Sequence, residues 1–206
     1  MKPEEIEAES FRIIDEEAGE HGRGSREWQV VRRAIHTSAD FEYARGMVLS
    51  DNAVQCGIDA IRSGAGIVTD TNMALSGISR ERLARFGCQF DCHVADPDVA
   101  ELAKKNGVTR SVLAMRKAAA NPANRIFVIG NAPTALFELL RLIREGSAQP
   151  ALIIGLPVGF VGAEESKNAL AATDGSIPFI TNMGRKGGSN VAAAVVNALA
   201  IQSVLE

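Results

Sequence analysis

Short apolar runs bounded by turn residues alternate along the chain with stretches of helical periodicity. Five runs rich in β-branched residues are expected to form strands, over residues 66–72, 88–94, 125–131, 150–157 and 178–182. The second of them is the most polar. The clearest helix is predicted from Pro133 to Glu145, where leucines and Ile143 recur at spacings of three and four. An Ala-rich helix is expected from Asn190 to Leu205.

The N-terminal third is expected to be helical. A short first helix ends at the Gly-rich segment 16–25, which we interpret as a loop rather than a domain boundary. In the next helix an apolar stripe is formed by Trp28, Val31, Ala34 and Ile35. His36 falls off that stripe, so it is not predicted to be a core histidine.

Alternation of strands and helices is typical of a mainly parallel sheet covered by helices on both faces. We therefore expect a single α/β domain over residues 1–206, with five strands in its sheet. Ligands bind such sheets at the carboxyl ends of the strands. The segments there are "DTN", "GNAPTA", "GLPVGF" and "TNMGRKGGS", which are rich in Gly, Asn or Thr.

Composition narrows the classes of function. A net charge of -3 argues against a nucleic-acid-binding protein, which normally carries a basic excess. The three cysteines suggest no disulfide framework, which favours a reducing cytoplasm. The N-terminus has no apolar signal core, and no apolar stretch is long enough to span a membrane. A cytoplasmic protein without a nucleic-acid or membrane partner is expected.

The segment "GRKGGS", from Gly184 to Ser189, follows a strand and opens a helix. Backbone amides at a helix N-terminus attract anions, and Arg185 and Lys186 add positive charge. A glycine-rich connection with a solvated basic pair would explain the same residues. The order of residues matches neither a Walker P-loop nor a dinucleotide-binding fingerprint, which counts against a nucleotide-dependent module.

Two further segments begin helices. In "IGNAPTALFELL", Pro133 suits a first helical turn, and Asn131 and Thr134 either cap the helix or bind a ligand beside its free amides. In "NGVTRSVLAM", Thr109 can cap a helix whose first turn holds Arg110. The helix dipole disfavours a cation there, so Arg110 is expected to pair with a neighbouring Asp or with an anionic ligand.

Histidine and cysteine offer two candidate sites. The Cys88–Cys92–His93 spacing is not a standard zinc spacing, and alternation along a strand would put Cys92 and His93 on opposite faces, so no metal is expected. His36 stands beside Arg32 and Arg33. A histidine among arginines could deliver a proton while the arginines hold a polyacid. An exposed residue at a helix end is the alternative.

Several segments, taken together and in this order over nearly the whole chain, resemble the precorrin-8X methylmutase family of cobalamin biosynthesis. They are "ESFRII" (9–14), "AIH" (34–36), "TDTNM" followed by "GI" (69–78), "TRS" (109–111), "IGNAPTALFELL" (129–140), "GLPVGFVGAEESKNAL" (155–170) and "GRKGGS" (184–189). "GNAPTAL" and "GLPVGFVGAEESK" are highly specific as a pair.

The resemblance implies a homodimer of flavodoxin-like, three-layer α/β/α domains. It implies an isomerase that moves a methyl group from C-11 to C-12 of a corrinoid substrate, precorrin-8X or cobalt-precorrin-8, to give hydrogenobyrinate or cobyrinate. The step is a sigmatropic shift that needs no separate cofactor. A non-catalytic tetrapyrrole carrier on the same fold is the alternative, and turnover separates the two.

The resemblance also assigns residues. The acid is the histidine matching His36, and the substrate contacts come from Ser10, Arg110, Asn131, Ala132, Gly184, Arg185, Lys186, Gly187, Gly188 and Ser189. Thr134 joins them through its place at a helix start, and Lys186 is not required by the family pattern. Asp70 follows a strand and could orient a polar group. The amphipathic N-terminal region is the candidate dimer interface, and a site near it would be lined by both subunits.

Overall fold

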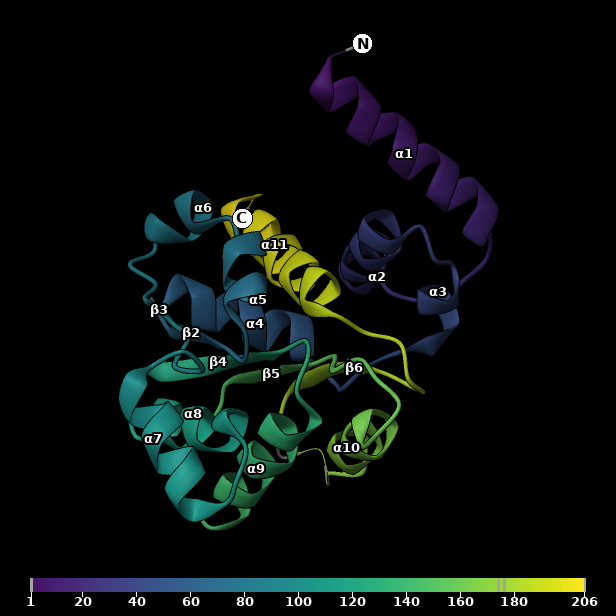
Figure 1. Ribbon diagram of the computed structural model, residues 1–206. Helices are drawn as coiled ribbons and strands as arrows, with labels where there is room; N and C mark the ends of the chain where they lie inside the picture. Colours follow the sequence, from purple (N-terminus) through teal and green to yellow (C-terminus); the bar gives the residue numbers. More distant parts are fainter. Residues whose placement is uncertain (1, 174, 176, 206) are drawn as a thin grey trace.

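A six-stranded sheet forms the centre of the computed structural model, which describes residues 2–173, 175 and 177–205 (Figure 1). The strands run in the spatial order β1-β6-β5-β4-β2-β3. They are β1 (Met47–Leu49), β2 (Gly66–Thr69), β3 (Phe90–Asp91), β4 (Asn124–Ile129), β5 (Leu152–Gly155) and β6 (Phe179–Asn182).

The five predicted strands are all present, and together they make the parallel part of the sheet. Their order is that of a flavodoxin-like doubly wound fold, so the predicted α/β/α class is confirmed. The expected number of strands was wrong by one. The additional strand β1 pairs antiparallel with β6 at the edge of the sheet, where Val48 lies opposite Thr181.

Eleven helices lie within the described residues. They are α1 (Pro3–Ala18), α2 (Ser25–Ser38), α3 (Glu42–Gly46), α4 (Ala53–Arg62), α5 (Asn72–Gly77), α6 (Arg80–Ala84), α7 (Pro97–Asn106), α8 (Arg110–Ala119), α9 (Pro133–Arg144), α10 (Ala163–Ala171) and α11 (Ser189–Leu205).

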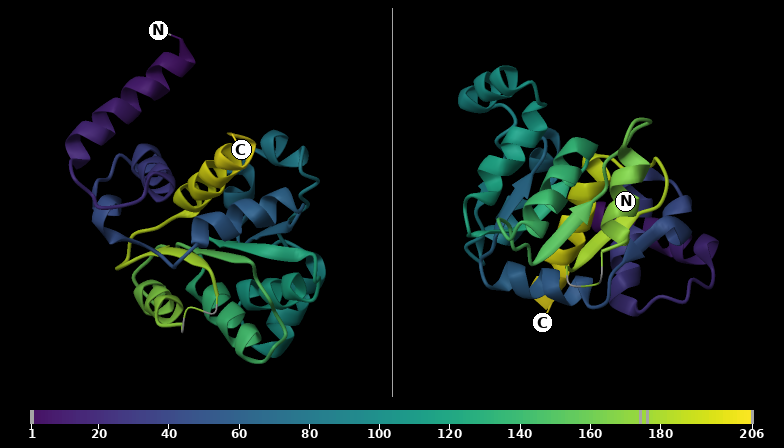
Figure 2. Two further views of the ribbon diagram at one scale, coloured as in Figure 1. Left: turned by 180° about the vertical axis from the view of Figure 1, so that it is seen from behind. Right: turned by 90° about the horizontal axis from the view of Figure 1, so that it is seen from below.

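The helices form a layer on each face of the sheet. Figures 1 and 2 show α4, α5 and α11 on one face, with α2 beside α11, and α7, α8, α9 and α10 on the other. All residues of β2, β5 and β6 are buried, because both faces of these strands are covered. The larger apolar core lies under α11, and a second lies under α9.

The predicted stripe of α2 is correct. Trp28, Val31, Ala34 and Ile35 are buried, and α2 packs against α11. The loop between the first two helices is shorter than expected, because α1 continues to Ala18. Within that loop the His21 ring stacks on Trp28 at 3.8 Å between centroids.

Helix α1 projects from the rest of the molecule (Figure 1). It packs on α2 through the buried side chain of Ile14, and the Trp28 indole donates a hydrogen bond of 2.7 Å to Asp15. The side chains of Ile6 and Ile13 remain 52% and 40% exposed, so α1 carries an apolar face that this chain does not cover. No helix among the described residues combines the length and the apolar character needed to cross a membrane.

Candidate functional site

Asp70 organises the loop that follows β4. It comes directly after β2, is 2% exposed, and its carboxylate accepts backbone N–H bonds from Gly130 at 3.0 Å, Asn131 at 2.9 Å and Ala132 at 2.7 Å. Burial raises the pKa of Asp70, while these three bonds act in the opposite direction. Asp70 therefore orients backbone amides and leaves the exposed Asn131 side chain free for a ligand.

One contact from the segment after β2 and one from the loop after β4 join this edge to the start of α11. The hydroxyls of Thr71 and Ser189 lie 2.9 Å apart, and the Thr71 hydroxyl also caps α5 by accepting from the Ala74 amide at 3.1 Å. A Cβ atom at Gly130 would lie 2.7 Å from the Ser189 Cα, so glycine is required for this close approach. The carboxyl ends of β2 and β4 and the N-terminus of α11 thus meet at one edge of the sheet.

Two helix N-termini open at this edge. Helix α9 begins at Pro133 without a side-chain cap from Ala132, and α11 begins at Ser189. The first amides of an α-helix have no partner within the helix, and they carry the positive end of the helix dipole. The positive ends of both dipoles therefore favour carboxylate groups at this edge.

The loop before α11 presents its two cations differently. Lys186 pairs with Asp40 at 2.5 Å and with Glu42 at 2.9 Å, and these hydrogen bonds raise its pKa. The Arg185 guanidinium lies 5.6 Å from the Phe160 ring centre, and no described carboxylate is within ion-pair distance of it. Of the predicted basic pair, only Arg185 is available to an anion, because Lys186 joins the loop to the segment after α2.

The glycines of this loop are fixed by contacts with the β5 end. A Cβ atom at Gly187 would lie 2.2 Å from the Leu156 carbonyl oxygen, and the Gly188 amide donates to that oxygen at 2.9 Å. Gly184 adopts a φ of 75°, in the left-handed region. The "GRKGGS" segment is therefore held against the sheet before the helix begins.

Arg110 and Thr134 lie at the same edge, on the opposite face. Thr109 caps α8 as predicted, accepting from the Val112 amide at 3.3 Å, and its hydroxyl donates to the Thr134 hydroxyl at 3.2 Å. Arg110 is exposed in the first turn of α8. Among the described residues no carboxylate is within ion-pair distance of Arg110, which favours the anionic ligand over the neighbouring Asp.

His36 and Ser10 lie on the N-terminal helices. The exposed His36 ring lies 5.1 Å from the Phe11 ring, centre to centre, at an interplanar angle of 56°. The two arginines beside it are bound to α1, Arg32 to Asp15 at 2.7 Å and Arg33 to Glu7 at 2.8 Å. The half-buried Ser10 donates to the Ile6 carbonyl oxygen at 2.8 Å.

The candidate residues therefore form two groups. Asp70, Arg110 and Thr134 lie with the loops 130–132 and 184–189 at the carboxyl edge of the sheet, whereas Ser10 and His36 belong to α1 and α2. The Asp40–Lys186 ion pair brings the end of α2 to the edge loop, four residues after His36. Among the described residues of one chain, no hydrogen bond or ion pair links Ser10 to the residues around Arg110.

Sequence reasoning missed two features of this edge. Phe160 and Val161, in the loop after β5, are 84% and 90% exposed. Lys167, on α10, is fully buried beneath the loop before α11 and hydrogen-bonded to its backbone. Its neighbours in "AEESKNAL" include two glutamates and an asparagine, so the local sequence gave no signal of its burial.

The cysteine and histidine cluster gives no metal site in the part of the chain that is described. No three His, Cys, Asp or Glu side chains gather there so that they could share an ion. His93 is bound to Asp96 at 2.9 Å, and the Cys88 thiol donates to the Ile61 carbonyl oxygen. The three cysteines are free.

Comparisons with known proteins all lead to one family. The sequence profile of precorrin-8X methylmutases matches residues 5–202. The chain is 49% identical to the cobalt-precorrin-8 methylmutase of Priestia megaterium, covering 98% of this chain and 88% of that one. It is 41% identical to the precorrin-8X methylmutase of Sinorhizobium sp., covering 93% and 90%. The solved precorrin-8X methylmutase of Thermus thermophilus superposes with a TM-score of 0.88 at 43% identity, covering 97% and 96%.

Proposed function

The chain belongs to the precorrin-8X methylmutase family, and on that premise we propose that it binds its substrate at the carboxyl edge of the sheet and uses His36 as the proton donor. It is an isomerase of cobalamin biosynthesis that moves a methyl group of precorrin-8X or cobalt-precorrin-8 from C-11 to C-12. The observation that carries this function is the family match over residues 5–202.

The edge suits a substrate that carries many acetate and propionate groups. The N-termini of α9 and α11 bring the positive ends of two helix dipoles to this edge, and Arg110 and Arg185 offer guanidinium groups that no described carboxylate occupies. Asn131 and Thr134 add exposed polar groups between them. Asp70 contributes by holding the loop amides in place rather than by touching the substrate.

In this proposal His36 is the acid that serves this edge, and the Asp40–Lys186 ion pair supports the assignment by joining the segment after its helix to the edge loop. Its ring packs on Phe11 and stays exposed, so it can reach a bound macrocycle. Protonation of the macrocycle next to the migrating methyl group makes the ring system more electron-deficient and eases the shift. Positioning of the substrate and proton donation then supply the catalysis.

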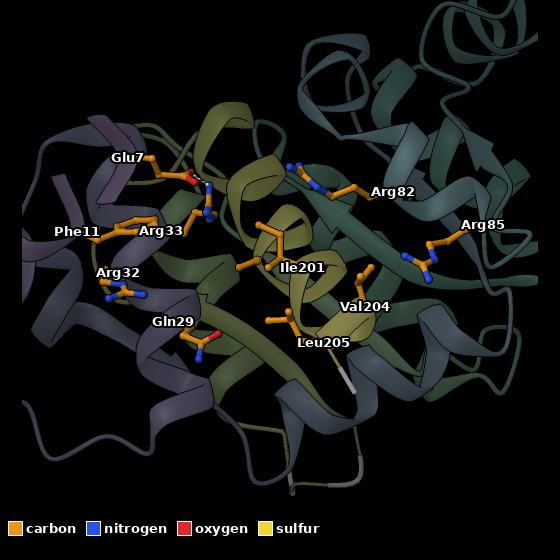
Figure 3. Close-up of a pocket in the computed structure, with 11 residues that line it drawn as sticks. Glu7, Phe11, Gln29, Arg32, Arg33, Arg82, Arg85, Ile201, Val204 and Leu205 are labelled. Carbon is orange, nitrogen blue, oxygen red and sulfur yellow. Dashed lines mark hydrogen bonds and ion pairs between the residues drawn. The ribbon is translucent and has the colours of Figure 1, made fainter. Parts of the chain in front are cut away.

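A second copy of the chain completes the site in this proposal. A groove of about 660 Å³ lies between α1, α2, α6 and α11. Figure 3 shows Arg82 and Arg85 on the side away from α1, with Ile201 near the middle. Helix α1 has seven acidic residues and one arginine, and the uncovered Ile6 and Ile13 lie two turns apart on it. Charge and apolar surface thus match between α1 of one copy and the groove of the other.

Ser10 lies between Ile6 and Ile13 on the uncovered face of α1, so a homodimer joined through this face would place Ser10 at the interface. Light scattering should give a dimer for the wild type and a monomer for Arg82→Glu/Arg85→Glu. The exposed Arg125, on β4, is the matched control for charge reversal. A dimer that survives the double reversal, or a fully active monomer, would remove the shared site.

Turnover tests the activity. Wild-type protein is incubated without oxygen with precorrin-8X and, separately, with cobalt-precorrin-8, and products are identified by mass and NMR. A methyl group at C-12 is the expected result. Binding without turnover of either substrate would instead identify a tetrapyrrole carrier.

We place the protein in the cytoplasm, because its three cysteines are free.

A further inference from the structure

Lys167 is the most unusual buried group outside the residues already assigned. It lies on α10, and its side chain is 0% exposed. Lysine is almost never fully buried unless it is paired, since burial of an ammonium group is costly. No carboxylate among the described residues is within ion-pair distance of its amine, and burial lowers the pKa of Lys167 to about 8.

Its partners are neutral oxygen atoms of one short segment. The amine donates to the Lys186 carbonyl oxygen and, at 3.5 Å, to the Asn182 side-chain oxygen. The Asn182 amide donates to the same Lys186 carbonyl at 2.9 Å and to the Met183 carbonyl at 3.0 Å. Lys167 and Asn182 thus hold the Met183 and Lys186 carbonyl groups of the loop 183–188 toward the interior.

The position of these carbonyls sets the geometry of the binding edge. Lys186 is followed by Gly187 and Gly188, which are pressed against the Leu156 carbonyl, and then by Ser189, where α11 begins. With the Lys186 carbonyl drawn inward, the side chains of Arg185 and Lys186 are left exposed on the outer side of the loop. The amine thereby fixes both Arg185 and the first amides of α11.

We propose that Lys167 is a positioning residue for substrate binding: its buried amine holds the loop 183–188 so that Arg185 and the N-terminus of α11 face the substrate carboxylates. The proposal rests on the proposed function. It requires no contact between Lys167 and the substrate. Loss of the amine should weaken substrate binding much more than it slows the chemical step. His36 lies on α2, whose position is set by its packing against α11, and the loop reaches the segment after α2 through the surface ion pairs of Lys186.

The test compares Lys167→Met with Ser166→Ala. Ser166 is the matched control, because it is equally buried on the same helix but donates only to the Ala163 carbonyl of its own chain segment. Steady-state turnover, titration with the product hydrogenobyrinate and amide hydrogen exchange are measured for both variants and the wild type. Asn182→Ala is the second variant, should Lys167→Met fail to fold.

Lys167→Met should raise KM and the product Kd about tenfold or more, the effect of losing one hydrogen bond from a charged group. Its kcat should change by less than about threefold, and amides of residues 184–191 should exchange faster. Ser166→Ala should leave KM, the product Kd, kcat and these exchange rates near their wild-type values. Unchanged KM and Kd in folded Lys167→Met, or equal losses in Ser166→Ala, would overturn the proposal. A wild type without turnover would instead refute the proposed function.

Discussion

Replacement of Asp70 by asparagine should lower the free energy of unfolding by disrupting the loop that follows β4. The carboxylate accepts three backbone N–H bonds, one on Oδ1 from Gly130 and two on Oδ2 from Asn131 and Ala132. An asparagine has only one side-chain oxygen, so its NH₂ group must face at least one of these donors.

The magnitude follows from the number of bonds lost. In the better orientation the amide oxygen keeps the two bonds to Asn131 and Ala132, and the Gly130 amide loses its acceptor. Removal of one buried bond to a charged group, with its donor left unsatisfied, costs about 2–3 kcal/mol. The opposite orientation would lose two bonds and cost more.

Urea unfolding followed by far-UV circular dichroism measures this difference. Asp59→Asn is the control, because Asp59 is exposed on α4, where its carboxylate accepts a hydrogen bond from Gln55 at 2.8 Å, so this replacement should cost less than about 0.5 kcal/mol. Asp70→Asn should also bind hydrogenobyrinate more weakly, because the loop amides move. Equal stability of Asp70→Asn and the wild type would refute this account of the edge loop.

Three other changes have equally definite outcomes. Gly187→Ala should lower the free energy of unfolding in urea and the affinity for hydrogenobyrinate, because the added Cβ would lie 2.2 Å from the Leu156 carbonyl oxygen. Wild-type values in both assays would contradict this. Hydrogen bonds from Arg141 and Arg116 lower the pKa of Glu138. The free energy of unfolding should therefore fall as pH drops below about 4.5, and less so in Glu138→Gln. The pKa of Lys167 is lowered to about 8 from 10.5, so the unfolded chain holds this proton to higher pH. The free energy of unfolding of the wild type should therefore rise as the pH goes from about 8 to 10.5, and that of Lys167→Met should lack this rise. Urea titrations at several pH values measure the difference.

Local pattern was sufficient for most of the fold. Periodicity placed the five parallel strands and the buried stripe of α2, and it put His36 outside that stripe, as the structure confirms. Thr109 was predicted as a cap because capping depends on neighbouring residues only. Strand β1 escaped prediction because it is an edge strand whose pairing with β6 joins residues more than a hundred positions apart.

The chemistry of the site depended on contacts that no local pattern reveals. Asp70 meets its three amides across 60 residues, and Lys186 meets Asp40 across 146. Both are set by how the layers pack. The burial of Lys167 is of the same kind, since a lysine in a helix is ordinarily a surface residue. The sequence was therefore enough to choose candidate site residues. It could not separate those that face the substrate from those that hold the loops in place.

The most direct test of the account is the anaerobic single-turnover rate of wild type against His36→Ala, with Thr37→Ala, at the neighbouring exposed position, as the control. Product methylated at C-12 is quantified by NMR, and hydrogenobyrinate affinity is measured for all three proteins. His36→Ala alone should keep its affinity for hydrogenobyrinate and lose about 100-fold or more in rate, the usual contribution of a general acid. Equal rates in His36→Ala and the wild type would contradict it.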